Sequence, residues 1–120
     1  MESSIDRTEF GSITVDGRTF EHDIVIRLSR EIKKRKKKLS SALYGTSHII
    51  SLEEARHVYE PGAERLLVGA GQYGLVSLSP EAAAYFDEQG CQVDLLPMQE
   101  AIEAWNEAGG AVLGLFHVTC

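Results

Sequence analysis

The sequence predicts a single three-layer α/β domain with a central mixed β-sheet, an N-terminal β-hairpin and helices on the sheet faces. Its 120 residues match a common domain size, and 43% apolar with 25% charged residues is the content of an ordinary globular protein. A turn signal between two apolar stretches near the N-terminus indicates antiparallel strands. Further along, amphipathic and short apolar segments alternate, which favours strands joined by right-handed helical crossovers. We expect residues 1–8 to be a flexible terminus and residues 9–120 to form the domain.

The hairpin signal is the clearest local pattern of the first half. Residues 13–15 and an apolar-rich run that ends at residues 24–26 flank Asp16-Gly17, a dipeptide suited to the two positive φ angles of a type I′ turn. Residues 29–50 carry no clear pattern, with residues 39–43 as a candidate for a short helix. A stretch of this length without regular structure is unusual inside a compact domain and is often functional or mobile.

The second half opens with a helix signal at Ser51. Ser51 and Glu54 form a capping box, in which the hydroxyl and the carboxylate accept hydrogen bonds from each other's backbone N–H groups. This pattern predicts a helix that runs to about Tyr59. Residues 65–69 are rich in apolar side chains and bounded by glycine, which predicts a buried strand.

The remaining elements follow from caps, glycines and apolar spacing. They are a loop at residues 69–74, a brief strand at 75–78, a helix from Ser79-Pro80 to Gly90, a strand at 92–96, a helix from Pro97 to Gly109-Gly110 and a last strand at 111–118. The last helix has one apolar face, formed by Met98, Ala101, Ile102, Trp105 and Ala108. We therefore expect Trp105 to be buried.

The charge is strongly segregated along the chain. The formal net charge is −6, yet residues 27–38 hold eight basic residues and one acid. Six consecutive cations at residues 33–38 repel one another by roughly 1 kcal/mol per close pair in water. They therefore need acidic neighbours in the fold, a bound anion or free solvation. No aromatic residue is interleaved for base stacking, so we expect no sequence-specific nucleic acid as a partner.

Cysteine and histidine give no metal or disulfide pattern. Cys91 and Cys120 are the only cysteines, and with no export signal in front of them we expect both to be reduced in a cytoplasmic protein. Four scattered histidines lack the spacing of metal ligands, and no apolar run is long enough to span a membrane. The sequence thus predicts no cofactor, no metal and no membrane partner.

Two short motifs could bind a ligand, and each also has a structural interpretation. Gly69-x-Gly71-x-x-Gly74 matches the dinucleotide fingerprint, but the next helix signal waits until Ser79. We therefore expect a turn that can hold a small anion. Residues 44–48 gather a phenol, two hydroxyls and an imidazole, which fits either a general base with hydrogen-bonding partners or a turn whose hydroxyls cap the following backbone.

We expect His117, in an apolar strand, to be a core histidine satisfied by the backbone, and no serine or cysteine has the context of a nucleophile. No catalytic residue is therefore predicted. The candidates for binding a small anion or other ligand come from the basic run and the two motifs: Lys34, Arg35, Lys36, Tyr44, Thr46, Ser47, His48, Gly69, Gly71 and Gln72.

The same motifs carry a family resemblance. They are the hairpin segment Phe10-Gly11-Ser12-Ile13-Thr14-Val15-Asp16-Gly17, the string Tyr44-Gly45-Thr46-Ser47-His48, the turn Gly69-Ala70-Gly71-Gln72-Tyr73-Gly74, Leu96-Pro97 with Glu100-Ala101, Asn106 and the ending His117-Val118-Thr119-Cys120. Over about residues 9–120 the chain resembles the Mth-type family of domains of unknown function. Its eukaryotic relatives include the mitochondrial complex I assembly factor three and the adipogenesis-associated Mth-domain protein. Met98 departs from the threonine that relatives often have there.

The resemblance implies a three-layer α/β fold and roles in assembly and regulation. Together with the absence of a catalytic set, it favours a non-enzymatic interaction or assembly module, a monomer or weak homo-oligomer, with an unknown protein partner that binds the basic segment. The alternative is a protein or enzyme that binds an anionic small molecule in a pocket near residues 69–74 and 44–48. Convergence of the basic run and those two segments on one concave pocket would favour the alternative, and a basic run on a flat outer face would favour the module.

Overall fold

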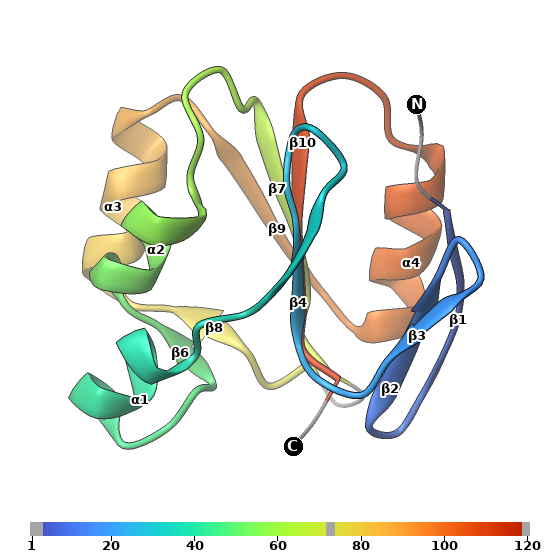
Figure 1. Cartoon of the computed structure of the whole chain (residues 1–120). Coiled ribbons are helices and arrows are strands. Elements are labelled where there is room, and N and C mark those ends of the chain that lie inside the picture. The colour runs from blue at the N-terminus through green and yellow to red at the C-terminus, as the bar shows by residue number, and fades with distance from the viewer. Residues whose placement is uncertain (1–3, 72–73, 119–120) are drawn as a thin grey trace.

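The computed structural model describes residues 4–71 and 74–118, and within them a mixed five-stranded sheet forms the middle layer (Figure 1). The strand order is β5 (Ile32–Lys34), β4 (Ile24–Ile26), β10 (Val112–Phe116), β7 (Arg65–Gly69) and β9 (Gln92–Leu96). β10, β7 and β9 run parallel, while β4 pairs antiparallel with both β10 and β5. The predicted α/β class with a mixed sheet is confirmed.

Both faces of this sheet are covered, which explains why its central strands are apolar throughout. One face carries α1 (Lys38–Tyr44), α2 (Leu52–Val58) and α3 (Pro80–Glu88), beside a short parallel pair of β6 (Ile49–Ile50) and β8 (Ser77–Leu78) (Figure 1). The other face carries α4 (Met98–Glu107) and a small sheet of β1 (Ile5–Glu9), β2 (Ser12–Val15) and β3 (Arg18–Phe20). A separate hydrophobic cluster fills the space on each face. Among the helices of the described residues, none has the length and apolar content needed to cross a bilayer.

The predicted turn is confirmed, but the hairpin is shorter than expected. Asp16 and Gly17 both have positive φ, at 49° and 80°, and they join β2 to β3. Residues 24–26, expected in the second hairpin strand, form β4 instead and enter the central sheet. All three residues of β4 are buried, because the sheet is covered on both faces there. The hairpin of β2 and β3 therefore belongs to the small sheet with β1 and not to the central sheet.

The expectation of a loose terminus at residues 1–8 is wrong for residues 5–8. They form most of β1, which pairs antiparallel with β2. Ile5 is buried, and Asn106 of α4 holds its backbone at both ends: Oδ1 accepts from Ile5 N–H at 2.8 Å, and Nδ2 donates to Ile5 C=O at 3.0 Å. The strand has one apolar residue among polar and charged ones, so it lacks the alternation by which a strand is recognised in a sequence.

The elements predicted in the second half are present. α2, β7, β8, α3, β9, α4 and β10 lie where caps and apolar spacing place them, and the candidate helix at residues 39–43 is α1. Trp105 is buried against the sheet, with its ring at 5.9 Å from Phe116 in an edge-to-face contact. The unpatterned stretch of residues 29–50 is divided among β5, α1 and β6.

Candidate functional site

Half of the predicted capping box at α2 is wrong, and the difference exposes a buried network. The Ser51 hydroxyl does accept from Glu54 N–H, at 3.1 Å. The Glu54 carboxylate, however, does not return to Ser51, whose N–H donates to the Ser40 hydroxyl at 2.9 Å. Glu54 instead pairs with Arg35, because a buried guanidinium is a stronger partner for a carboxylate than a backbone amide.

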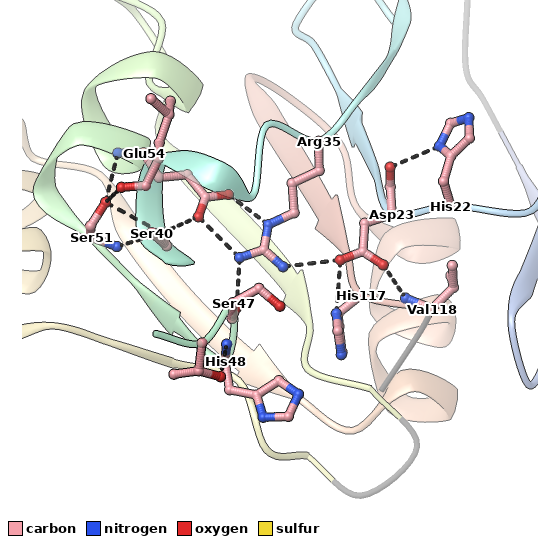
Figure 2. A network of polar contacts seen from close by, with 12 residues as sticks. His22, Asp23, Arg35, Ser40, Ser47, His48, Ser51, Glu54, His117 and Val118 are labelled. Carbon is pink, nitrogen blue, oxygen red and sulfur yellow. Dashed lines mark hydrogen bonds and ion pairs between the residues drawn. The ribbon is translucent and has the colours of Figure 1, made fainter. Parts of the chain in front are cut away.

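Arg35 is the centre of this network (Figure 2). Its Nε and Nη2 donate to the two Glu54 oxygens at 2.6 and 3.0 Å, its Nη1 donates to Asp23 Oδ2 at 3.0 Å, and Nη2 also donates to Ser47 C=O at 2.8 Å. The Ser40 hydroxyl donates to Glu54 as well. The side chains of Arg35 and Glu54 are 0% exposed and that of Asp23 is 2% exposed. One guanidinium thus ties α2 and the loop before β6 to the residue that precedes β4.

The charges of this network stabilise one another. Burial alone would lower the pKa of the Arg35 guanidinium, but the hydrogen bonds and charges of Glu54 and Asp23 raise it above its usual value. Burial alone would raise the pKa of the Asp23 carboxyl. The hydrogen bonds from His117 and Val118, with the charge of Arg35, hold that pKa far below its usual range instead. Asp23 is therefore an ionised, buried hydrogen-bond acceptor.

Asp23 also orients His117. Its Oδ2 lies 2.8 Å from Nδ1 of His117, and its Oδ1 accepts from Val118 N–H at 2.9 Å. Because an ionised carboxylate only accepts, the His117 Nδ1 carries the proton in this contact. The predicted core location of His117 is confirmed, at 3% exposure. The expected backbone partner is wrong, since the ring nitrogen bonds a carboxylate.

Three predicted segments meet at this histidine, which lies at the carboxyl ends of the parallel strands β7 and β10. The rings of His48 and His117 make an edge-to-face contact with centroids 5.2 Å apart. Gly71, which follows β7, lies so close that an added Cβ would be 3.0 Å from Cδ2 of His117. Arg35 and Ser47 join through the hydrogen bond given above. Each of the three segments, namely the basic run, residues 44–48 and the glycine loop, thus contributes at least one residue to the cluster around Asp23 and His117.

The glycine motif itself forms a turn, as predicted. Gly71 and Gly74 have positive φ, at 87° and 64°, and Gly74 N–H donates to Gly71 C=O at 3.2 Å. The next helix, α3, begins only at Pro80, after β8. Gly69 is required for packing, because a Cβ there would lie 2.7 Å from the Phe116 ring. Gln72, the remaining candidate of this loop, lies outside the described residues.

The other candidate residues stay outside the network. Lys34 and Lys36 are exposed on either side of buried Arg35, and Tyr44 is exposed at the end of α1. The Thr46 hydroxyl accepts from His48 N–H at 3.1 Å, which is the turn-capping role proposed for this string. In the described part of the chain, no group of three His, Cys, Asp or Glu side chains is placed to hold a metal ion.

Sequence reasoning missed Asp23 and Glu54, and it misjudged the partner of His117. The one available signal was charge: six adjacent cations needed acidic neighbours, and Asp23 directly precedes a buried apolar strand. Glu54 was hidden because its position also fits a helix cap. The separation of 94 residues between Asp23 and His117 leaves no local pattern.

The fold and this network define a small three-layer α/β domain with a buried ionic cluster at the carboxyl ends of its parallel strands. Residues 5–116 match the family model described as a protein of unknown function (DUF498/DUF598). The chain belongs to this family, and the resemblance to Mth-type domains is confirmed.

Solved structures agree with this assignment. A conserved hypothetical protein of Pyrococcus horikoshii OT3, PH1505, is 36% identical, with a TM-score of 0.87 over 98% of this chain and 99% of that one. A protein named MT938 is 32% identical, with a TM-score of 0.81 over 99% of this chain and 100% of that one. A Mth938-like domain of Bordetella pertussis shares the fold at 20% identity, with a TM-score of 0.63 over 97% of this chain and 85% of that one.

Proposed function

We propose that this domain is a non-enzymatic interaction module of the cytoplasm that binds an acidic partner protein through a lysine segment, defined as Lys33, Lys34, Lys36, Lys37 and Lys38. The observation that carries the proposal is the way the basic run divides by residue type. Its arginines are used by the fold, whereas its lysines lie at the surface beside an open sheet edge. Arg35 stands between lysines in the sequence, yet the two groups differ in environment.

The arginines of the run are occupied by intramolecular contacts. Arg27 pairs with Glu60 at 3.1 Å. Arg30 donates to the Val112 C=O at 3.0 Å, and its guanidinium lies 5.2 Å from the centre of the Trp105 ring. Arg35 is enclosed by its two carboxylates. These contacts use the planar fork of arginine, which suits fixed and partly buried positions.

The lysines are in a different situation. Lys33, Lys34, Lys36 and Lys38 are exposed, and Lys37 is half-buried. Lys33 has an ion pair with Glu31 at 3.5 Å, but both side chains are more than half exposed, so the pair contributes little. Among the described residues, no ion pair forms at Lys34, Lys36 or Lys38. Their charges are available to carboxylates of a partner.

The backbone beside these lysines supports the same proposal. β5 is the edge strand of the central sheet, and no described strand pairs with its outer side. A lysine-rich edge discourages pairing with unrelated strands, because their backbones bring no compensating charge. An extended acidic segment can add to such an edge and neutralise the lysines at once. Outside residues 27–38 the chain carries seventeen acids and four basic residues. This distribution favours residues 27–38 as the place where an acidic partner binds.

The test is a titration of isotope-labelled protein with a synthetic peptide of alternating glutamate and valine, followed by NMR. We expect shifts of backbone amides in β5 and at the start of α1, with affinity that falls as salt is added. Replacing Lys34, Lys36 and Lys38 by Gln should weaken binding about tenfold, from roughly 0.5 kcal/mol per charge contact.

A matched control removes the same charge elsewhere. Arg7, Arg18 and Arg56 are exposed, and their replacement by Gln should leave the affinity within a factor of about two of the parent value. Equal losses in the two triple variants, or shifts that avoid β5, would overturn the proposal. Tighter binding of single-stranded DNA than of the peptide would replace the acidic protein partner with a nucleic acid.

A further inference from the structure

We propose that Nε2 of His117 is the proton-accepting atom of a small-molecule site at the carboxyl ends of β7 and β10, for a neutral or cationic ligand that presents an N–H or O–H donor. The site does not include the lysine segment. Its test is therefore independent of the test of the proposed interaction module. It rests on the fixed orientation of the ring, the open position of Nε2 and the charge of the cluster behind it.

The orientation of the His117 ring is fixed from behind. Nδ1 donates to Asp23, and Asp23 is itself held by Arg35 Nη1 at 3.0 Å and by Val118 N–H at 2.9 Å. A carboxylate held in this way sets the tautomer of the histidine, leaving the lone pair of the neutral ring on Nε2. The same arrangement orients the histidine of a catalytic base.

Nε2 lies at the open end of the ring. No hydrogen bond to this atom is formed by the residues that the structure describes. In the same part of the chain, every buried side-chain nitrogen or oxygen has a partner. Nε2 must therefore reach the surface, although the residue as a whole is 3% exposed. Figure 2 shows this nitrogen on the far side of the ring from Asp23, on the side where His48 lies.

Two neighbours shape the approach to Nε2. The ring of His48 meets the ring of His117 edge to face. On the glycine loop, a Cβ added at Gly71 would lie 3.0 Å from Cδ2 of His117 and 3.9 Å from Nε2, so the Gly71 backbone packs directly beside this edge of the ring. The place itself is typical, because open α/β sheets bind ligands beyond the carboxyl ends of their parallel strands.

The charge behind His117 selects the class of ligand. Two buried carboxylates, those of Asp23 and Glu54, face the single guanidinium of Arg35. With a neutral histidine this cluster carries an excess negative charge in a region of low dielectric constant, which disfavours an anion at Nε2. Arg35 was a candidate for holding an anion, but four of its five N–H donors already bond the two carboxylates and Ser47 C=O. A donor that is neutral or positively charged fits best.

The first arm of the test reads the atom directly. In mildly alkaline buffer, long-range nitrogen–proton NMR spectra of the histidine rings should show His117 with a protonated Nδ1 and a bare Nε2. Diethyl pyrocarbonate, which acylates unprotonated ring nitrogens, should modify His117 as well as exposed His57, with the adducts located by mass spectrometry. A protonated Nε2, or acylation of His57 without His117, would overturn the proposal. Neither measurement depends on a variant.

The second arm tests the ligand class with acetamidinium, a small cation with N–H donors, and with inorganic phosphate. At millimolar concentrations acetamidinium should shift the His117 ring signals and the Gly71 amide saturably, and phosphate should not. In Asp23→Asn the amide oxygen can still accept from Arg35 and His117, but the negative charge behind the ring is lost, so acetamidinium should bind at least about tenfold more weakly. His57→Gln, in which the replaced residue lies on the exposed side of α2, should bind as the parent does.

Each outcome of the second arm decides the proposal. Saturable shifts with acetamidinium that disappear in Asp23→Asn support it. Shifts of His117 with phosphate instead would establish an anion site, and unchanged His117 signals with both probes would remove the ligand site altogether. If Asp23→Asn proves unfolded by its NMR spectrum, His117→Gln replaces it. This variant retains Asp23 and Arg35 and should lose the acetamidinium response at Gly71.

Discussion

Arg35 and the lysine segment occupy the same six-residue run and end in opposite environments. Arg35 is fully buried between two carboxylates, whereas Lys34 and Lys36 on either side of it are exposed. A run of like charge is therefore not one functional unit. Side-chain chemistry separates its members: the guanidinium makes several fixed hydrogen bonds in one plane, and the ammonium group remains hydrated at the end of a flexible chain.

The two regions differ accordingly in what holds them. A buried ion pair forms only with considerable desolvation of both partners, so the loss of one partner leaves an uncompensated charge in the interior. Exposed cations at a solvated sheet edge are hydrated in both the folded and the unfolded chain. They therefore change the free energy of unfolding little. Stability should therefore depend on Arg35, and recognition of acidic partners should depend on the lysine segment. The predictions that follow begin with the largest expected effect.

Arg35→Met should lower the free energy of unfolding by about 3–5 kcal/mol, because it leaves the Asp23 and Glu54 carboxylates buried without their guanidinium. Urea unfolding followed by circular dichroism measures the change, with Lys36→Met as the exposed neighbouring control. A loss that matches that of Lys36→Met would show that the network contributes nothing beyond a surface charge.

Arg35→Lys should lower the free energy of unfolding by about 2 kcal/mol, an intermediate value, since lysine retains the charge but lacks the fork that reaches Glu54, Asp23 and Ser47 together. The same urea experiment applies. If this variant is as stable as the parent protein, charge alone holds the network and the geometry of the fork is unimportant.

Acid should weaken the network through Asp23. The pKa of this carboxyl is lower in the folded protein than in the unfolded chain, so its contribution to stability is complete above the ordinary carboxyl pKa of about 4 and is lost as the pH falls below it. Between neutral pH and about pH 3 the parent protein should therefore lose more stability than Asp23→Asn does. Thermal unfolding at a series of pH values measures this difference. If the parent protein and Asp23→Asn lose the same stability as the pH falls, Asp23 is not a source of acid sensitivity.

The smallest effect on stability belongs to the lysines. Replacing Lys34, Lys36 and Lys38 by Gln should change the free energy of unfolding by no more than about 0.5 kcal/mol, because these side chains are exposed and make no ion pair with described residues. Urea unfolding at low and high salt measures it. A large stabilisation of the triple variant at low salt would mean that mutual repulsion of the lysines strains the folded state.

The sequence predicts the second half of the fold well, because its elements carry their own local signals. Ser51 and Ser79 accept from the helix backbone where the caps were expected, and the spacing around Trp105 identifies the buried face of α4. The sheet to which β4 belongs could not be predicted, since a short apolar strand suits either sheet. β1 was missed because its single buried side chain, Ile5, produces no pattern.

The candidate site was predicted only in part, for a different physical reason. Arg35, Ser47, His48 and Gly71 were selected by chemistry and do lie together. Their organising partners are Glu54 and Asp23, 19 and 12 residues from Arg35, and His117, 94 residues from Asp23. Such contacts depend on how sheet and helices pack, and no residue spacing encodes them. Only the excess of positive charge in residues 33–38 pointed to buried acids.

The contrast between Arg35 and the lysine segment can be read in one NMR experiment on arginine and lysine side-chain N–H groups during titration with the acidic peptide. We predict that the Nε–H signal of Arg35 exchanges slowly with water and does not move when salt or peptide is added. The ammonium signals of Lys34, Lys36 and Lys38 should shift with both. An Arg35 signal that exchanges as fast as that of exposed Arg56, or that moves with the peptide while the lysines do not, would contradict the account.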